Sequence, residues 1–328
     1  MKCMWRKFIF AVPIVLLLAC ERAEEYRPTG RENEVVFICD GFPDHIFTLD
    51  SLINDTFFTP QETPLFRITP ITYEQFITYM NYKNIVILSY PDSPNHEFYS
   101  RVFPSTGVGV YIRKNVFTER DLVFGVYSES KDSVLKLLNY YAPVLKQRIF
   151  ENYISFLKDK EYFLGYDKKL TKKLFKEHGF TFELSPGWVY INHDENFFTL
   201  YKHYPDRFIY CYTAASEKPL DANAFMHIRD SLGQIYYDGD QILRSSIRVD
   251  TIGINGVPAI VIVGAWQNDK NTTGGGLINI SFNKDGCFYM FDYGIYNPDV
   301  QDKIEYILRG YLIFKTVKLK NDGHSKNP

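Results

Sequence analysis

Residues 247–266 read IRVDTIGINGVPAIVIVGAW and contain the clearest structural signal in the chain. Two strand-like apolar runs, 247–254 and 257–266, flank Asn255 and Gly256. Asn-Gly between two such runs is the strongest short-range signal of a β-hairpin, because both residues accept the left-handed backbone conformation that the tight turn requires. We therefore predict antiparallel pairing here and an antiparallel sheet in the second half of the chain.

Further strands and helices are expected on both sides of this hairpin. Strands are predicted at 180–184, 188–192, 197–203, 208–213, 277–282 and 287–295. The turn Pro186-Gly187 would join the first two into a hairpin, and the turn at 283–286 would join the last two. Helices are predicted at 167–178, at 221–236 and from Asn297 to Tyr311.

The spacing of apolar residues predicts which side of each helix is buried. The helix at 221–236 would bury Phe225, Ile228, Leu232 and Ile235 and leave Arg229 and Asp230 on its polar side. The last helix would direct Val300, Ile304, Ile307, Leu308 and Tyr311 to the sheet. Five lysines lie in the helix at 167–178; a solvated face is the favoured interpretation, and contact with an anionic membrane surface is the alternative.

The first half of the chain alternates strands and helices. Strands are predicted at 34–39, 84–89, 107–113 and 122–127, and a capping box at Thr72-x-x-Gln75 begins a helix that runs through Met80. Ser130 caps a long helical pattern that continues to about Lys158. Pro143 lies inside this pattern and is expected to kink the helix or begin a second segment, because proline cannot donate the interior hydrogen bond.

These elements predict an α+β fold with antiparallel sheets flanked by helices, in two subdomains. The N-terminal α/β subdomain would span 34–160 and the C-terminal antiparallel α+β subdomain 167–318, with a tail at 319–328. The order of elements in the C-terminal half and the Pro186-Gly187-Trp188 step resemble the α/β/α sandwich of the extrinsic photosystem II proteins. That resemblance implies a fold and says nothing about an activity.

Composition and cysteine spacing exclude some functional classes. The chain has 37 basic and 39 acidic residues among 328, so it lacks the basic excess of nucleic-acid-binding proteins, and no nucleic-acid partner is expected. Cys39, Cys211 and Cys287 lie far apart in apolar runs, which favours core packing over catalysis. The sequence contains neither Cys-x-x-Cys nor His-Glu-x-x-His, so we expect no metal and no cofactor.

The first twenty residues indicate export and lipidation. Basic residues precede the uncharged run 8–19, which is shorter than the roughly 20 apolar residues that span a bilayer. The run ends in Leu-Leu-Ala-Cys20, which resembles a bacterial lipobox. That resemblance implies a signal peptide at 1–19 and a lipid on the Cys20 thiol. The charged residues at 20–33 are expected to form a solvated tether.

The chain also resembles a family of lipoproteins from Bacteroidetes that is defined by a domain of unknown function. The residues that carry this resemblance are 62–66 (ETPLF), 83–87 (KNIVI), 229–231 (RDS) and 274–276 (GGG), together with the lipobox. The resemblance would cover residues 34–316. It implies a lipid-anchored protein of the cell envelope, with the outer membrane as the expected location, and it implies no reaction and no ligand.

Few residues in the chain suggest a functional site. His193, Asp194 and Glu195 form a dense polar triplet that could supply a base and its orienting group, but a turn between strands is the favoured interpretation. For Arg229 with its neighbour Asp230, a local ion pair is favoured over ligand binding. Trp266 and the glycines at 274–276 could form an aromatic platform for a glycan, although hairpin packing explains them equally well.

Three functions therefore stay open. The favoured one is a lipid-anchored envelope protein that binds or scaffolds another component and has no catalytic residues, because motifs for catalysis are missing from the sequence. The second is a periplasmic hydrolase with a non-standard site, in which His193, Asp194 and Arg229 would have to converge in one cleft. The third is a glycan-binding module. The expected partners are thus the lipid bilayer and either an envelope protein or a glycan.

Overall fold

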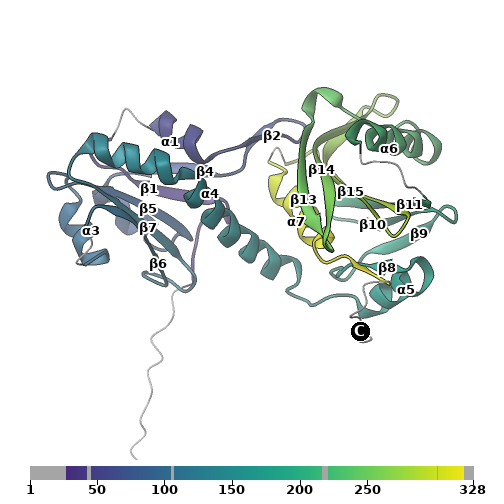
Figure 1. Ribbon diagram of the computed structural model, residues 1–328, viewed down its shortest axis with the longest axis horizontal. Helices are drawn as coiled ribbons and strands as arrows, with labels where there is room; N and C mark the ends of the chain where they lie inside the picture. Colours follow the sequence, from purple (N-terminus) through teal and green to yellow (C-terminus); the bar gives the residue numbers. More distant parts are fainter. Residues whose placement is uncertain (1–26, 43–45, 105–106, 216–220, 301, 321–328) are drawn as a thin grey trace, which may run out of the picture.

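A computed structural model of the chain describes residues 27–42, 46–104, 107–215, 221–300 and 302–320. Figure 1 shows two units side by side, an N-terminal unit in purple and blue and a C-terminal unit in teal to yellow, with a long helix between them. Each unit has its own large sheet, covered by helices. The fold is therefore of the α+β class, as predicted.

The sheet of the N-terminal unit has five strands in the order β4-β1-β5-β7-β6. Their bounds are β1 Glu34–Ile38, β4 Arg67–Ile71, β5 Asn84–Ser89, β6 Gly109–Lys114 and β7 Leu122–Tyr127. Strands β4, β1, β5 and β7 run parallel, and β6 is antiparallel to β7. The structure thus differs here from the expected antiparallel pairing. The central strands are buried on both faces, and their unbroken apolar runs are typical of parallel pairing.

Helices cover both faces of this sheet. On one face lie α1 (Ile46–Ile53) and α4 (Lys131–Glu161), and on the other lie α2 (Phe76–Tyr79) and α3 (His96–Val102). Ser130 caps α4 as predicted, because its Oγ accepts the Ser133 N–H at 3.4 Å. The helix continues through Pro143 as a single element, because its buried stripe repeats every three or four residues on both sides of the proline and keeps it packed on the sheet.

The C-terminal unit is built on an eight-stranded antiparallel sheet in the order β12-β14-β15-β16-β11-β10-β9, with β13 also paired to β14. The bounds are β9 Val189–Asn192, β10 Phe197–Lys202, β11 Asp206–Ala215, β12 Gln241–Ile242, β13 Arg248–Ile254, β14 Val257–Asn268, β15 Thr273–Lys284 and β16 Cys287–Tyr296. The predicted hairpin of β13 and β14 is confirmed, since Asn255 and Gly256 have left-handed φ angles of 49° and 77°. The predicted hairpin of β15 and β16 is confirmed as well.

The hairpin predicted at Pro186-Gly187 does not form. β8 (Phe180–Thr181) pairs instead with β17 (Lys318–Leu319), and β9 pairs with β10. Phe180 and Phe182 are fully buried beneath the large sheet, so this segment belongs to the core rather than to the sheet edge. Leu319, which we expected in the tail, is buried in the same ribbon.

Helices cover both faces of the large sheet. α6 (Ala222–Tyr236) lies on one face, and α5 (Lys168–His178), α7 (Ile304–Phe314) and the β8–β17 ribbon lie on the other (Figure 1). α6 buries Phe225 and Leu232 as predicted, but it also buries Arg229 completely, whereas Ile235 is 70% exposed. The placements predicted for Arg229 and Ile235 are therefore wrong. The helix is rotated so that positions 225, 229 and 232 face the sheet.

α7 packs against both units. Ile307 and Phe314 belong to the core beneath the C-terminal sheet, whereas Ile304, Leu308 and Leu312 belong to the core that α4 forms in the N-terminal unit. The prediction that Ile304 and Leu308 face the sheet is therefore wrong. A helix wedged between two cores buries two sides, and apolar spacing alone does not say which neighbour each side contacts.

Candidate functional site

His193 lies in the turn between β9 and β10, and its side chain has internal partners. Its Nε2 lies 3.1 Å from Thr199 Oγ1 and 2.9 Å from the Tyr237 hydroxyl oxygen. Burial lowers the pKa of His193, and the charge of Asp194 opposes this effect. The lowered pKa favours the neutral imidazole, which is hydrogen-bonded between β10 and the end of α6.

Asp194 is bound within the same turn. Its Oδ1 accepts the backbone N–H groups of Asn196 at 2.7 Å and Phe197 at 2.8 Å, and its Oδ2 accepts the Tyr236 hydroxyl. The hydrogen bond from Tyr236 and those from the backbone lower the pKa of Asp194. Its carboxylate thus stabilises the turn and does not contact His193 as an orienting group would.

A hollow of about 670 Å³ lies beside this turn, between β11 and the outer side of α6. Its walls include Asp194, Glu195, Tyr212 and Tyr236. Neither His193 nor Arg229 belongs to its walls. The three residues that the hydrolase hypothesis needs are therefore not brought together in this hollow.

Arg229 points from the inner side of α6 into the core. Its Nε lies 3.5 Å from Oδ2 of Asp292 on β16, and both side chains have 0% exposure. The guanidinium carbon lies 5.5 Å from the centre of the Tyr210 ring, in cation–π geometry. Within the described part of the chain, no group accepts a hydrogen bond from the three guanidinium nitrogens. Arg229 is thus an internal charge rather than a surface group.

Asp292 is part of a polar row that crosses four strands beneath α6. Thr199, Tyr210, Asp292 and Asn279 are successive register partners on β10, β11, β16 and β15. Asn279 Nδ2 donates to Asp292 Oδ2 at 3.2 Å. Burial raises the pKa of Asp292, and the charge of Arg229 and the bond from Asn279 oppose that rise. Because all four side chains are buried, the row is an internal layer and does not face solvent.

Trp266, on β14, is buried on the face of the large sheet that α6 covers. It is 5% exposed, and its Nε1–H donates to the carbonyl oxygen of Ile295 at 3.3 Å. Gly275 lies beneath the indole, and a Cβ there would come within 1.7 Å of the same carbonyl oxygen. The glycine therefore permits close strand packing under Trp266, and the ring has no open face for a glycan.

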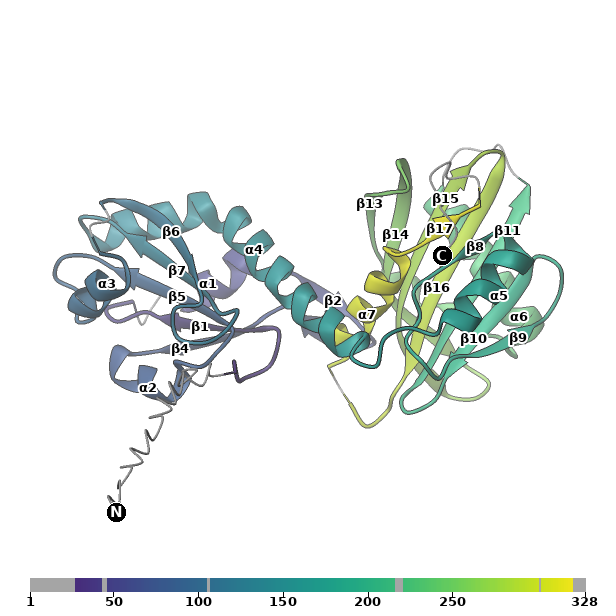
Figure 2. The same cartoon turned by 90° about the horizontal axis from the view of Figure 1, so that it is seen from below.

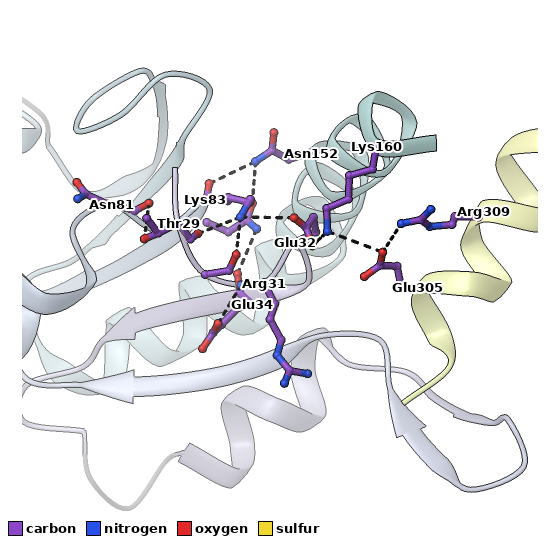
Figure 3. Close-up of polar contacts among 12 residues, drawn as sticks. Thr29, Arg31, Glu32, Glu34, Asn81, Lys83, Asn152, Lys160, Glu305 and Arg309 are labelled. Carbon is purple, nitrogen blue, oxygen red and sulfur yellow. Dashed lines mark hydrogen bonds and ion pairs between the residues drawn. The ribbon is translucent and has the colours of Figure 1, made fainter. Parts of the chain in front are cut away.

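Cys20 lies outside the described residues, but the segment that follows it is held on the fold from Thr29 onward. Lys83 Nζ donates to the carbonyl oxygens of Thr29 at 3.0 Å and Gly30 at 2.6 Å and lies 3.7 Å from Oε1 of Glu32 (Figure 3). The prediction of a solvated tether at 20–33 is therefore wrong for residues 29–33, because these contacts make Thr29 to Asn33 part of the fold. We call Thr29, Gly30, Glu32, Lys83 and Lys160 the Lys83 cluster.

Ion pairs continue from this cluster into the C-terminal unit. Lys160 Nζ lies 2.7 Å from Oε2 of Glu32 and 3.8 Å from Oε1 of Glu305 (Figure 3). Arg309 pairs with Glu305 at 2.6 Å and with Glu161 at 3.2 Å. Burial alone would raise the pKa of Glu32, but the two lysines outweigh it and lower the pKa. The N-terminal segment is thus connected through α4 to α7.

An apolar cleft of about 400 Å³ lies between the two units. It is lined by α4, α7, the sheet at β13 to β15, and the first strand of the hairpin of β2 (Thr56–Phe58) and β3 (Glu62–Pro64), which reaches across to contact β14. Its apolar walls include Phe57, Phe150, Ile252, Val263, Ile307 and Tyr311. The two units therefore form this cleft jointly.

Charged side chains at the cleft neutralise one another. Asp55 pairs with Lys146 on α4 at 2.6 Å and with Arg248 on β13 at 3.3 Å. Burial alone would raise the pKa of Asp55, but the bonds and charges of the two basic residues outweigh it and lower the pKa. Asp250 also lines the cleft, so two basic and two acidic groups are present. The cleft has apolar walls and no net formal charge.

Sequence reasoning missed this cleft, because its lining residues come from elements far apart in the chain. Each apolar residue appears locally as part of its own element's core, and the strand that contributes Phe57 is too short to give a periodic signal. One signal was present: the last helix carries apolar residues around more than one side, as a helix between two cores requires.

In the described ranges, no helix is both long and apolar enough to cross a membrane. Over the same residues, no group of three or more His, Cys, Asp or Glu side chains could hold a metal ion.

Comparison with known proteins gives a family match for the C-terminal unit. Residues 167–316 match the family described as "Domain of unknown function (DUF4837)". No curated protein matches the chain. The matched segment begins at the residue that caps α5 and ends just after α7.

Two solved structures show a distant similarity. One is the solution structure of cyanobacterial PsbP from Synechocystis, with 7% identity, a TM-score of 0.31, and coverage of 43% of this chain and 86% of that one. The other is a crystal structure from Bacteroides thetaiotaomicron, with 9% identity, a TM-score of 0.28, and coverage of 46% of this chain and 48% of that one.

Proposed function

We propose that this chain is a lipid-anchored protein of the bacterial cell envelope that binds an apolar small molecule in the cleft between its two units. The anchor is the lipid on Cys20, and the outer membrane is its proposed location. The observation that carries the binding function is the apolar cleft of about 400 Å³. Small-molecule sites commonly have about 300–1,000 Å³, lie at domain interfaces, and combine apolar walls with a few polar groups.

The charges at the cleft indicate the kind of ligand. Asp55 pairs with both Lys146 and Arg248, and Asp250 brings the formal charge of the lining to zero, so the cleft offers no excess of either charge to an ionic ligand. Moving a charged ligand into an apolar site without a counter-charge is costly. We therefore propose a ligand with a large apolar part and no net charge.

The two alternative functions receive less support from the geometry. A hydrolase would need His193, Asp194 and Arg229 in one cleft, but Arg229 is buried beneath α6 and the other two are hydrogen-bonded in a turn. A glycan site on Trp266 would need an exposed ring, which this side chain lacks. Binding of an apolar small molecule is thus favoured over both alternatives.

The ligand site is tested with an uncharged apolar dye, N-phenyl-1-naphthylamine, whose fluorescence rises in apolar surroundings. The chain from Glu21 to Pro328 retains every described residue and should bind the dye. Ile252→Trp fills the cleft from β13 and should weaken binding about tenfold or more. Val249→Trp is the matched control, because Val249 lies on the same strand, is 49% exposed, and does not line the cleft. Equal dye binding by both variants would refute this site.

The anchor is tested separately in cells. An alkyne-bearing fatty acid should label the wild-type chain, and Cys20→Ala should abolish the label. An equally strong label on the Cys20→Ala chain would refute lipidation at this residue, whatever the dye shows. Fractionation of the labelled envelope then tests the outer-membrane location.

A further inference from the structure

The linker between α4 and α5 carries an exposed apolar tip. Phe163 is 85% exposed and Leu164 is 77% exposed, and Tyr166 close by is 42% exposed. Among the described residues, Phe163 and Leu164 are the only large apolar side chains next to each other in sequence that are both this exposed. Single exposed apolar residues are ordinary on protein surfaces, but an adjacent pair at the tip of a linker indicates contact with another apolar phase.

A basic surface begins immediately after this tip. α5 buries Leu170, Thr171 and Leu174 and exposes Lys168, Lys169, Lys172, Lys173 and Lys176 on its opposite side. Lys173 pairs with Glu177 at 4.0 Å. In the part of the chain that the structure describes, Lys169, Lys172 and Lys176 take part in no ion pair. These lysines are therefore available to an anionic surface.

The anchored end of the fold lies beside the same tip. Arg27, the first described residue, lines a hollow of about 770 Å³ together with Phe163, Phe156 and Lys160. The Lys83 cluster fixes the segment just after Arg27 against β5 and α4 (Figure 3). Figure 1 shows the α4–α5 linker and α5 along the lower edge of the molecule, and in Figure 2, seen from below, both lie toward the viewer.

The length of the chain before Arg27 limits how far this face can be from the bilayer. Arg27 lies seven positions after Cys20. At no more than about 3.6 Å per residue, a lipid on Cys20 keeps Arg27 within roughly 25 Å of the membrane surface. The face that contains Arg27, Phe163 and the lysines of α5 is thus held close to the lipid.

We infer that Phe163 and Leu164, with the lysines of α5, form a membrane-facing surface that contacts anionic lipid headgroups and orients the anchored protein. Phe163 and Leu164 enter the interface between headgroups and acyl chains, and Lys169, Lys172 and Lys176 lie over the headgroups. The lipid on Cys20 holds the protein at the membrane, and a basic patch with an apolar tip adds contacts that fix which face of the protein lies on the lipid. This inference rests on the anchor of the proposed function.

The insertion is tested on the lipidated full-length protein in vesicles of phosphatidylcholine and phosphatidylglycerol. Phe163→Trp is a depth reporter, because Trp188 and Trp266 are buried, at 6% and 5% exposure. Phospholipids brominated in their acyl chains should quench the new tryptophan. Tyr140→Trp is the control, because Tyr140 is 77% exposed on α4 in the N-terminal unit and should stay unquenched. Equal emission of the two variants in brominated and ordinary vesicles would overturn the inference.

The basic surface is tested without the anchor, with the chain from Glu21. It should sediment with vesicles that contain phosphatidylglycerol and not with phosphatidylcholine alone. Each lysine near an anionic surface contributes about fivefold to partitioning, so Lys169→Glu and Lys172→Glu should each lower it more than fivefold. Lys136→Glu, an exposed lysine on α4, should leave it unchanged.

The outcomes separate this inference from the proposed function. If the wild-type chain, which keeps Cys20, receives no lipid, the proposed anchor is refuted. The vesicle partitioning of the chain from Glu21 then still decides whether the basic surface exists. A lipidated protein whose Phe163→Trp emission is unquenched refutes the membrane-facing surface while the anchor stands. Partitioning that is equal for the Lys172→Glu and Lys136→Glu variants also refutes it.

Discussion

Arg229 on α6 and Asp292 on β16 form an ion pair with no exposed surface, with 3.5 Å between Nε and Oδ2. The pair joins the helix to the polar row of the sheet, to which Asp292 belongs, and lies next to the ring of Tyr210. A buried ion pair adds little net stability over an apolar pair of similar size, but losing one partner leaves an uncompensated charge in the core. The pair therefore fixes how α6 is placed on the sheet more than it adds to stability.

We expect single substitutions in this pair to be strongly destabilising. Arg229→Met leaves the Asp292 carboxylate buried alone and should lower the free energy of unfolding by about 3–5 kcal/mol. Asp292→Asn should have a cost of similar order. The double variant should lose clearly less than the sum of the two, as urea denaturation would show. Strict additivity would contradict the pairing.

The effect of Arg229→Met should depend on pH. Burial raises the pKa of Asp292, and Arg229 opposes that rise, so removing Arg229 raises the pKa further. A carboxyl group whose pKa is higher in the folded state than in the unfolded state favours folding when protonated, so stability falls as pH rises. The difference between wild type and Arg229→Met should therefore shrink from pH 7 toward about pH 4. A constant difference in urea denaturation over this range would argue against it.

Asp55 should show the opposite pH dependence. Lys146 and Arg248 lower its pKa below the ordinary value of 3.8, so the ionised group stabilises the fold above that pH and the contribution is lost as pH falls below it. Asp55→Asn should destabilise the protein by about 1 kcal/mol at pH 7, a discounted value because all three side chains are partly exposed. Wild type and variant should converge at acid pH. Denaturant titrations at several pH values measure the difference.

Lys83 should control the order of residues 29–34. Lys83→Met removes the donor to the carbonyl oxygens of Thr29 and Gly30 and should cost about 1.5–3 kcal/mol. Hydrogen exchange at residues 29–34 and tryptic cleavage after Arg31 should both become faster. Lys136→Met, at an exposed position on α4, is the control and should change neither. Unchanged exchange in the Lys83 variant would show that the segment is held by other contacts.

The two sides of α7 should respond differently when the N-terminal unit is removed. In the full chain, Leu308→Ala and Ile307→Ala should each cost about 2–5 kcal/mol, because both side chains are buried. In a fragment of residues 167–320, which keeps the β8–β17 ribbon, Leu308 loses its partners on α4, so Leu308→Ala should cost little there, while Ile307→Ala should stay costly. Thermal unfolding of these four variants and their two parent proteins tests this. If Leu308→Ala destabilises the full chain and the fragment by the same amount, Leu308 does not depend on α4 and its assignment to that core is wrong.

The elements that the sequence predicts well are those with short-range causes. The Asn255-Gly256 turn, the Ser130 cap of α4 and the α5 helix that ends at Gly179 all follow from the conformational preferences of a few neighbouring residues. The predicted hairpin of β8 and β9 does not form, because a long-range packing preference overrides the local turn signal. Pro186-Gly187 permits a turn, but Phe180 is more stable in the core beneath the sheet, and no local preference records that competition.

By itself, the sequence determined the α+β class, the two confirmed hairpins, and the helices whose caps and apolar spacing are local. It also contains the run ending at Cys20 that resembles a lipobox, a linear signal whose processing stays a prediction. Only the tertiary structure decided that Arg229 lies beneath α6, that α7 divides its two sides between the units, and that residues from Asp55 to Tyr311 meet in one cleft. Local preferences act over a few residues, whereas burial depends on which surfaces the folded chain brings together across hundreds of residues.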